Sequence, residues 1–355
     1  MEKIAILGAG VMGSAVSWPL TDNGYAVNLI GTHLDDEIIK NCIENRFHPR
    51  LKRRIPDGVS PFYHSELTQA LEGVSFIVSG VNSKGVRWIG KTLAPHLKQG
   101  DRVIAITKGL EANAEGDLLI LPEVMRAEFP AEVRDAVAVA AVGGPCIAGE
   151  LAARRQSCVY FGAHTIETAR SLRAYFKTDY YHVWATNDIY ALEVAVALKN
   201  AYALGVGIAA GVLESAGGVD AAGAHMHNLA AALFARGCKE IHTLLVSQGL
   251  DPQFAYSLPG AGDLYVTSAG GRSVTLGRLM GSGMPYSQAV GELTGETLES
   301  AMIIQQMAKA LPALYKQGRV IQGQLPFMDL LVDMVVNDSQ LNMDLDLFFQ
   351  DVVTE

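Results

Sequence analysis

Side chains that could transfer a proton or bind a phosphate occur at a few places where the surrounding sequence is apolar or rich in glycine. Lys199, followed by Asn200, lies in an alanine-rich stretch of helical character. Lysine is rarely buried without a purpose, and burial favours the neutral amine, which suits proton transfer near neutral pH. A lysine that reaches solvent from a half-exposed helix face would show the same local pattern.

A carboxylate follows a glycine turn downstream of this lysine. Asp263 comes directly after Gly260-Ala261-Gly262, and Thr267 lies four residues later. In an apolar neighbourhood such a carboxylate could orient a substrate hydroxyl or hold a catalytic lysine. It could equally cap the N-terminus of a helix, and the two roles are compatible.

An arginine flanked by glycines is the next candidate. Arg272 and Ser273 follow Gly270 and Gly271. A guanidinium group binds an oxyanion or a phosphate bidentately, so this pattern favours an anion site. An exposed arginine in a flexible loop is the alternative.

Two polar turns follow predicted strands in the first half of the chain. Lys108, between Thr107 and Gly109, comes at the tip of a strand, where its side chain would project toward a bound ligand. The turn from Gly143 to Ala148, which contains Gly144 and Cys146, offers exposed N–H groups suited to a phosphate or a nicotinamide amide. A solvated loop lysine and a plain connecting turn are the alternatives.

The chain opens with an apolar strand, Ile4–Leu7, that runs into the turn Gly8-Ala9-Gly10-Val11-Met12-Gly13. Gly8 permits a tight turn, Gly10 lets the backbone approach a pyrophosphate, and Gly13 lets the following helix pack on the strand. That helix would direct its free N–H groups at the diphosphate. The turn therefore predicts a nucleotide site, and a turn that only packs a strand–helix–strand unit is the alternative.

Alternating strands and helices are expected to position these groups. Short apolar runs without polar alternation predict buried parallel strands at Ile4–Leu7, Ala26–Ile30, Phe76–Ser79, Arg102–Thr107, Val137–Val142 and Cys158–Gly162. Helical patterns lie between them at Ser14–Leu20, Asp36–Glu44 and Val86–Leu97. This alternation is typical of a doubly wound α/β sheet, which binds ligands beyond the carboxyl ends of its strands.

The composition changes near Asp188, after which the pattern is helical. Helices are expected at Tyr190–Leu213, Met226–Gln248, Glu292–Lys316, Leu325–Asp333 and Met343–Val353. The alanine and glycine content of the first of these suggests a backbone that its neighbours approach closely. We therefore predict a doubly wound dinucleotide-binding domain over residues 1–187 and an all-α domain over residues 188–355.

Composition excludes several classes of protein. The 355 residues carry a formal charge of −9, which provides no electrostatic footprint for nucleic acid. The four cysteines are scattered and have no clustered histidines, so neither a disulfide framework nor a metal site is expected. No run approaches the ~18 uninterrupted apolar residues of a membrane span, and no signal peptide is visible. A cytoplasmic protein is expected.

Taken in order, these motifs resemble the NAD(P)-dependent glycerol-3-phosphate dehydrogenases. The matching segments run from about residue 4 to residue 300 and are GAGVMG, TKGLE, GGPCIAGEL, ALKNAYALGVGIAAG, ARG, GAGDL and GGRS. The segment His48-Pro49-Arg50-Leu51 resembles a variant found in some prokaryotic members. A lysine–asparagine pair on a helix, followed by GDL and then GGR, is the most specific part of the resemblance.

The resemblance implies an N-terminal Rossmann domain, a helical C-terminal domain and a homodimer. It implies reversible hydride transfer between NAD(P)H and the C2 carbonyl of dihydroxyacetone phosphate, a reaction of glycerophospholipid metabolism. Lys199 would be the general acid/base, Lys108 would contact substrate and cofactor, and Asp263 would organise the catalytic lysine. The residues implied for substrate binding are Lys108, Gly144, Cys146, Asn200, Asp263, Thr267, Arg272 and Ser273. Those implied for the cofactor are Gly8, Gly10, Val11, Met12, Gly13, Lys108, Ala148, Arg272 and Glu299.

Three positions depart from the family pattern. Ser273 stands where the family usually has Asn, Cys146 replaces a Ser or Thr, and Ser300 replaces a Gly. Another polyol or sugar phosphate, or a small keto or hydroxy acid as in ketopantoate-reductase-like enzymes, therefore remains an alternative substrate. A non-catalytic NAD(P) sensor is a further alternative.

The choice between NAD and NADP is left open. An acidic residue at the end of the second strand would bind the ribose 2′-OH and favour NAD. That strand is followed by Gly31-Thr32-His33, and acids appear only at Asp35 and Asp36. A basic run from Arg50 to Arg54 could meet a 2′-phosphate, although such a run is more often a solvated loop.

Overall fold

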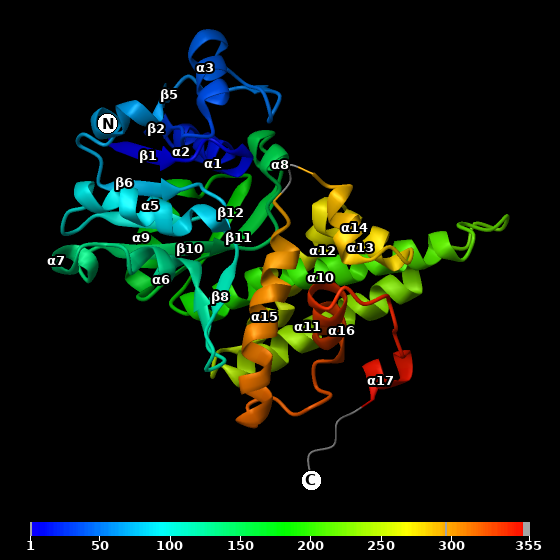
Figure 1. The fold of residues 1–355 in the computed structure, drawn as a ribbon. Helices are drawn as coiled ribbons and strands as arrows, with labels where there is room; N and C mark the ends of the chain where they lie inside the picture. Colours follow the sequence, from blue (N-terminus) through cyan, green and yellow to red (C-terminus); the bar gives the residue numbers. More distant parts are fainter. Residues whose placement is uncertain (1, 295–296, 351–355) are drawn as a thin grey trace. The chain divides into compact units, whose positions relative to one another are not determined.

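The computed structural model describes residues 2–294 and 297–350 and divides the chain into two compact units (Figure 1). The first unit comprises Met1–Lys108 and Ile120–Glu193, and the second comprises Gly109–Leu119 and Val194–Glu355. The division falls within a long helix, α10 (Ile189–Ser215), shortly after the expected boundary between residues 187 and 188.

An eight-stranded sheet forms the centre of the first unit, in the order β12-β11-β10-β7-β6-β1-β2-β5. The strands are β1 (Lys3–Leu7), β2 (Ala26–Ile30), β5 (Val59–Phe62), β6 (Phe76–Ser79), β7 (Arg102–Ala105), β10 (Ala138–Gly143), β11 (Ser157–Ala163) and β12 (Tyr181–Thr186). All neighbours pair in parallel except β10 and β11. The strand order reverses between β1 and β6, which is where doubly wound sheets bind their ligands.

The direction predicted for Cys158–Gly162 is wrong, because β11 runs antiparallel to β10 with Ala141 opposite Gly162. The connection between these two strands contains only the short helix α8 (Ala148–Ala152), whereas a parallel crossover usually contains a full helix. Helix α9 (Ile166–Phe176) supplies such a crossover, so β12 pairs in parallel with β11.

Two strands of this sheet were not predicted. β5 and β12 form the two edges of the sheet, and polar or cyclic residues such as Pro61 and His182 interrupt their apolar runs. Edge strands tolerate such residues because one side of the strand makes no ladder hydrogen bonds.

Side chains of the central strands alternate between two hydrophobic clusters, one on each face of the sheet. In β1, Ile4 and Ile6 belong to one cluster, and Ala5 and Leu7 belong to the other. Helices α1 (Val11–Ala15), α2 (Ser17–Asp22), α3 (Asp36–Asn45), α8 and α9 contribute to the first cluster. Helices α4 (Leu67–Ala70), α5 (Val86–Leu93) and α6 (Leu121–Arg126) contribute to the second. Helices therefore cover both faces, which confirms the doubly wound fold predicted from the apolar runs.

The remaining elements of the first unit are short. They include one further α-helix, α7 (Ala131–Arg134). Single 3₁₀ turns occupy residues 64–66, 83–85 and 94–96, and a small ribbon pairs β3 (Phe47–His48) with β4 (Arg53–Arg54). The single helix expected over Ser14–Leu20 is interrupted at Val16, because Pro19 has no N–H to donate to the carbonyl of Ala15.

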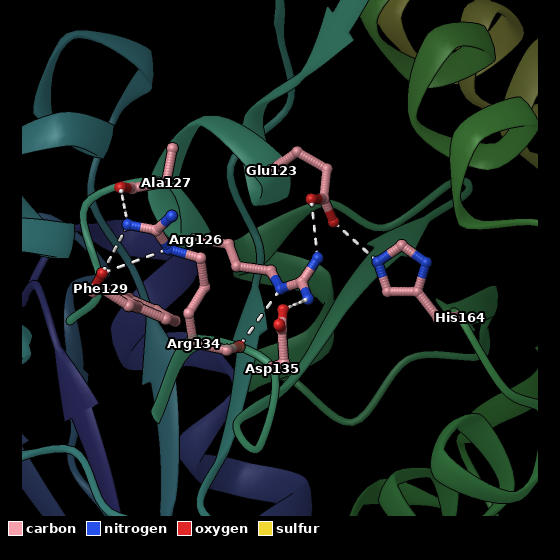
Figure 2. A network of polar contacts seen from close by, with 7 residues as sticks. All are labelled: Glu123, Arg126, Ala127, Phe129, Arg134, Asp135 and His164. Carbon is pink, nitrogen blue, oxygen red and sulfur yellow. Dashed lines mark hydrogen bonds and ion pairs between the residues drawn. The ribbon is translucent and has the colours of Figure 1, made fainter. Parts of the chain in front are cut away.

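A network of polar contacts connects the segment that contains α6 and α7 with His164, which directly follows β11 (Figure 2). Arg126 lies 3.2 Å from a carboxylate oxygen of Glu123 and 2.7 Å from one of Asp135. The guanidinium of Arg134 donates to two backbone carbonyls of the same segment. His164, directly after β11, lies 2.7 Å from the second oxygen of Glu123. These contacts hold the residue that follows β11 and do not involve a predicted site residue.

The second unit is mainly helical, as predicted. Its helices are α10, α11 (His227–Ser247), α12 (Asp263–Ser268), α13 (Arg272–Gly281), α14 (Tyr286–Gly291), α15 (Glu299–Lys316), α16 (Pro326–Val336) and α17 (Leu345–Phe349). A 3₁₀ turn (Pro252–Tyr256) and a single π-helical turn (Leu258–Gly262) precede α12. A short ribbon of β8 (Leu110–Ala112) and β9 (Leu118–Ile120) was not predicted.

Two helix boundaries differ from the predictions. The helix expected from Glu292 begins at Glu299, and the preceding residues 286–291 form the separate helix α14. The helix expected over Met343–Val353 is the short α17, and the predicted residues 351–353 lie outside the described residues. The first prediction extended the periodic apolar pattern through the turn at residues 292–294.

Glycines bring α10 and α13 into backbone contact, as the composition of α10 suggested. A Cβ on Gly207 would lie 2.5 Å from the carbonyl oxygen of Val274, and one on Gly277 would overlap the carbonyl oxygen of Leu204. A Cβ on Gly211 would collide with the carbonyl oxygen of Arg278. Three glycines on two helices therefore fix how closely α13 approaches α10.

Helix α10 is long and apolar enough to cross a membrane by length and composition alone. However, 83% of its most apolar 18-residue window is buried inside the protein. This burial is what a core helix of a folded domain shows, and α10 also carries the buried polar residues Glu193, Lys199 and Asn200.

Candidate functional site

The glycine turn lies at the carboxyl end of β1, where the strand order reverses. Gly8 has a φ of +114°, and a Cβ there would lie 2.7 Å from the carbonyl oxygen of Gly80, which follows β6. A Cβ on Gly13 would overlap the carbonyl oxygen of Gly8, so the start of α1 packs directly on the turn. Around Gly10, by contrast, the nearest atom to such a Cβ is the Gly80 oxygen, 4.0 Å away. Gly8 and Gly13 permit backbone contact, and Gly10 leaves the space that a pyrophosphate requires.

The other predicted residues of this turn open α1. Val11 is exposed and Met12 is half-buried against the core. Sequence reasoning missed Gly80, although a glycine directly after the predicted strand Phe76–Ser79 was a visible signal. A Cβ on Gly80 would lie 2.9 Å from the Gly8 carbonyl oxygen, so this third glycine completes the close contact between the tips of β1 and β6.

Lys108 and Gly144 meet at the carboxyl ends of β7 and β10. The ammonium of Lys108 donates a hydrogen bond of 3.2 Å to the carbonyl of Gly144. Gly144 has a φ of +132°, and a Cβ there would lie 2.9 Å from the carbonyl oxygen of Cys158, so only glycine fits. Cys146 is half-buried, and Ala148 is the first residue of α8, which packs against α1. Like the glycine turn, these residues therefore follow the carboxyl ends of strands in the parallel part of the sheet.

A buried carboxyl group near Lys108 was not predicted. Glu193, in the first turns of α10, is completely excluded from solvent, and neither carboxyl oxygen has a hydrogen-bond partner among the described residues. Burial raises the pKa of Glu193 well above its ordinary value, and the charge of Lys108 opposes that shift. The signal in the sequence was a glutamate within the run Ala191–Ala197.

In the second unit, Lys199 forms a buried cluster with Asp263 and Thr267. Its ammonium lies 3.0 Å from Asp263 Oδ1 and 2.5 Å from Thr267 Oγ1. The side chains of Lys199 and Asp263 expose 7% and 3% of their area. Lys199 therefore does not extend into solvent from its helix. Asp263 is the first residue of α12, so the start of this helix places its carboxylate beside the lysine.

The geometry of this cluster follows from local structure. The π-helical turn Leu258–Gly262 leads directly into α12, and a Cβ on Gly260 would overlap the carbonyl of Ala255. Asp263 and Thr267 are separated by four residues and therefore lie on one face of α12. π-helical turns are rare and occur often at functional sites.

The other residues predicted for the second unit lie at helix starts or inside α10. Asn200 follows Lys199 and is 6% exposed. Arg272 is exposed and begins α13 after two glycines with φ of +159° and +102°, and Ser273 is half-buried beside it. Glu299 begins α15 and is half-buried, and the hydroxyl of Ser300 is buried without a hydrogen-bond partner among the described residues.

The side chains of this arrangement are of the types that transfer protons. Within residues 2–294 and 297–350, no group of three or more His, Cys, Asp or Glu side chains is placed to hold a metal ion. An ammonium held by a carboxylate and a hydroxyl can stabilise negative charge on a substrate oxygen and then protonate it.

Comparison with known proteins identifies related sequences over nearly the whole chain. Residues 3–169 match the family model of the NAD-dependent glycerol-3-phosphate dehydrogenase N-terminus, and residues 188–343 match that of the C-terminus. An NADP(+)-dependent glycerol-3-phosphate dehydrogenase of Archaeoglobus fulgidus is 35% identical over 82% of this chain and 83% of its own. A glycerol-3-phosphate dehydrogenase [NAD(P)+] of Enterococcus faecalis is 28% identical over 96% of this chain and 93% of its own.

A solved structure shares the fold. The crystal structure of glycerol-3-phosphate dehydrogenase from Coxiella burnetii has a TM-score of 0.78 and covers 96% of each chain at 23% sequence identity. At that identity the likeness supports the architecture described above, namely a doubly wound sheet followed by helices.

Proposed function

Because this chain belongs to the NAD-dependent glycerol-3-phosphate dehydrogenase family, we propose that it interconverts dihydroxyacetone phosphate and sn-glycerol 3-phosphate with NAD(H) or NADP(H). The observation that carries the proposal is the buried cluster of Lys199, Asp263 and Thr267. A buried ion pair contributes little net stability compared with apolar residues of similar size, so a chemical role accounts for it better than a structural one.

Each residue of the cluster has a separate role in this proposal. Hydride would be supplied or accepted by a nicotinamide cofactor held at the glycine turn of Gly8, Gly10 and Gly13. Lys199 protonates the C2 oxygen during reduction and removes the proton during oxidation. Asp263 and Thr267 hold the ammonium in one position, so that no reorganisation is needed as charge develops on the oxygen.

The groups that would bind the cofactor and substrate lie on both units. Gly8, Gly10 and Gly13 would receive the pyrophosphate, because Gly10 leaves open space while its neighbours pack closely. Lys108 would contact substrate and nicotinamide from the carboxyl end of β7. Arg272 would bind the substrate phosphate, since a guanidinium at the start of a helix matches phosphate in charge and in geometry.

The test is oxidation of NADH and of NADPH by the pure protein with dihydroxyacetone phosphate, beside a panel of other ketose phosphates and small keto acids. We expect dihydroxyacetone phosphate to have the highest kcat/KM, and the two cofactors to reveal the preference that the sequence leaves open. Turnover of another panel member alone would reject the substrate and assign Cys146 and Ser273 to a changed pocket. Cofactor binding without any turnover would favour the sensor alternative.

Two further properties belong to the proposal. We expect a cytoplasmic enzyme and a homodimer, by analogy with the family. Light scattering coupled to size-exclusion chromatography measures the oligomeric state directly, and a monomeric mass would reject the dimer.

A further inference from the structure

The residue in the middle of the glycine turn, Ala9, is held by side chains from a distant part of the chain. Its neighbours use backbone partners, since the Gly8 N–H donates to Ile30 and the Gly10 carbonyl accepts from Ser14. The Ala9 N–H donates instead to Asp35 Oδ2 at 3.2 Å, and the Ala9 carbonyl lies 3.0 Å from His48 Nε2. Ser14 Oγ reaches the same carbonyl at the longer distance of 3.3 Å.

Asp35 faces the glycine turn although its position favours another role. It immediately precedes α3, where an aspartate commonly caps the helix, yet its side chain makes no capping bond. Asp35 Oδ2 accepts from the N–H and the hydroxyl of Thr32 at 2.9 and 2.8 Å as well as from Ala9. The carboxylate is buried, with 8% of the residue exposed. Asp35 thus joins the end of β2 to the turn after β1.

His48 is completely buried, and its hydrogen bonds define one tautomer. The N–H of Leu51 donates to His48 Nδ1 at 3.0 Å, so this nitrogen carries no proton. Nε2 therefore holds the proton of the neutral ring and donates it to the Ala9 carbonyl. Burial lowers the pKa of His48, which favours the same neutral form, with Arg50 acting in that direction and Asp35 against it.

From this geometry we infer that Asp35 and His48 are positioning residues for cofactor binding, which set the orientation of the two peptide planes that flank Ala9. In a trans peptide the C=O and the next N–H point in opposite directions. The bond from His48 to the Ala9 carbonyl therefore turns the Gly10 N–H away from His48. Gly10 borders the open space in the turn, so this orientation decides whether its amide can donate to a pyrophosphate.

The inference rests on the proposed function only in that the protein binds a nicotinamide dinucleotide. Two substitutions distinguish the hydrogen bond that His48 Nε2 donates to Ala9 from the one that Nδ1 accepts from Leu51. His48→Asn keeps an acceptor near Nδ1 and loses the donor near Nε2, whereas His48→Gln supplies an amide donor at the reach of Nε2 and loses the acceptor. His182→Asn is the matched control, because His182 lies in the edge strand β12 and bonds to Gln156.

The measurement is the Kd of NADH and NADPH by fluorescence titration of the full-length protein without substrate, followed by kcat and both KM values. We expect His48→Asn to raise the cofactor Kd about tenfold, His48→Gln to raise it no more than about threefold, and kcat at saturating cofactor to stay unchanged. A folded His48→Asn variant whose Kd stays within about twofold of the unaltered protein would overturn the inference, as would equal losses in both variants.

Variants of Asp35 test the hydrogen bond to the Ala9 N–H in the same way that the His48 variants test the bond to the Ala9 carbonyl. Asp35→Asn keeps an acceptor oxygen and is expected to bind cofactor almost normally, whereas Asp35→Ala is expected to lose about tenfold. This pair keeps the inference testable if a His48 variant does not fold, and equal Kd values for both Asp35 variants and the unaltered protein would overturn it. Because the Kd is measured without substrate, absence of turnover with dihydroxyacetone phosphate would count against the proposed function alone.

Discussion

Lys199 Nζ lies 3.0 Å from Asp263 Oδ1, and both side chains are almost completely shielded from solvent. Removing either partner deprives the other buried charge of this counter-charge, so effects on catalysis and on folding must be separated. A buried pair broken on one side typically costs about 3–5 kcal/mol of stability, whereas removal of both charges costs far less.

We expect Lys199→Ala to lower kcat by about 10²- to 10⁴-fold, because the group that protonates the C2 oxygen is lost, while the Kd of the cofactor remains nearly unchanged. The double variant Lys199→Ala/Asp263→Asn also replaces the buried carboxylate with a neutral amide. It should recover thermal stability without recovering turnover. Lys239→Ala, at an exposed position of α11, is the control. Recovery of turnover together with stability would assign Lys199 a structural role only.

Arg272→Ala is expected to raise the KM of a phosphorylated substrate by about 10- to 100-fold, since a charge-assisted bidentate contact to phosphate is worth about 1.5–3 kcal/mol. The cofactor KM should change much less. Arg278→Ala is the matched control, because Arg278 lies on the same helix and pairs with Glu214 at 2.8 Å. Steady-state kinetics with each substrate varied in turn provides the measurement. Equal KM values for Arg272→Ala and the unaltered protein would remove Arg272 from the phosphate site.

The contact between α10 and α13 leads to a prediction about stability. Gly277→Ala would place a methyl group on the Leu204 carbonyl oxygen, and we expect a loss of about 1–3 kcal/mol in the free energy of unfolding. Gly291→Ala is the control, because a Cβ there meets no atom within 4 Å and alanine favours the helix. Urea denaturation of both variants measures the difference. An equally stable Gly277→Ala variant would mean that α13 can move away from α10.

The sequence was sufficient to predict elements whose signal is local. The glycine turn after β1 lies where its spacing predicted, and the alanine- and glycine-rich stretch forms the closely packed helix α10. The antiparallel direction of β11 could not be predicted in the same way, because it depends on the length of helix in the preceding connection.

Long-range contacts between polar side chains were the least predictable part of the site. Asp35 was noted only as an acid near the end of the second strand, whereas its Oδ2 atom accepts hydrogen bonds from Thr32 and Ala9. His48 was noticed only as part of a family-like segment, and its contact with Ala9 crosses 39 residues. Spacing along a sequence shows which residues share a turn or a helix face, but it does not show which distant turn they contact.

Glu193 provides a prediction about pH. Its native pKa is raised well above 4.5 because the carboxyl group is fully buried, although the charge of Lys108 opposes the shift. Above pH 4.5 the native state therefore keeps a proton that the unfolded chain has released. As a result, the contribution of Glu193 to the free energy of unfolding falls as the pH rises above 4.5.

Glu193→Gln removes the titration and nearly preserves the shape of the side chain. Relative to the unaltered protein, the variant should become progressively more stable as the pH rises above 4.5, by at most about 1.4 kcal/mol for each pH unit. Urea denaturation at several pH values measures this difference, and the comparison cancels the similar contribution of Glu240, whose pKa burial raises to about 7. As a control, the free energy of unfolding of the exposed Glu72→Gln variant should differ from that of the unaltered protein by the same amount at every pH. A constant difference for Glu193→Gln as well would mean that Glu193 is ionised in the native protein, held by the charge of Lys108.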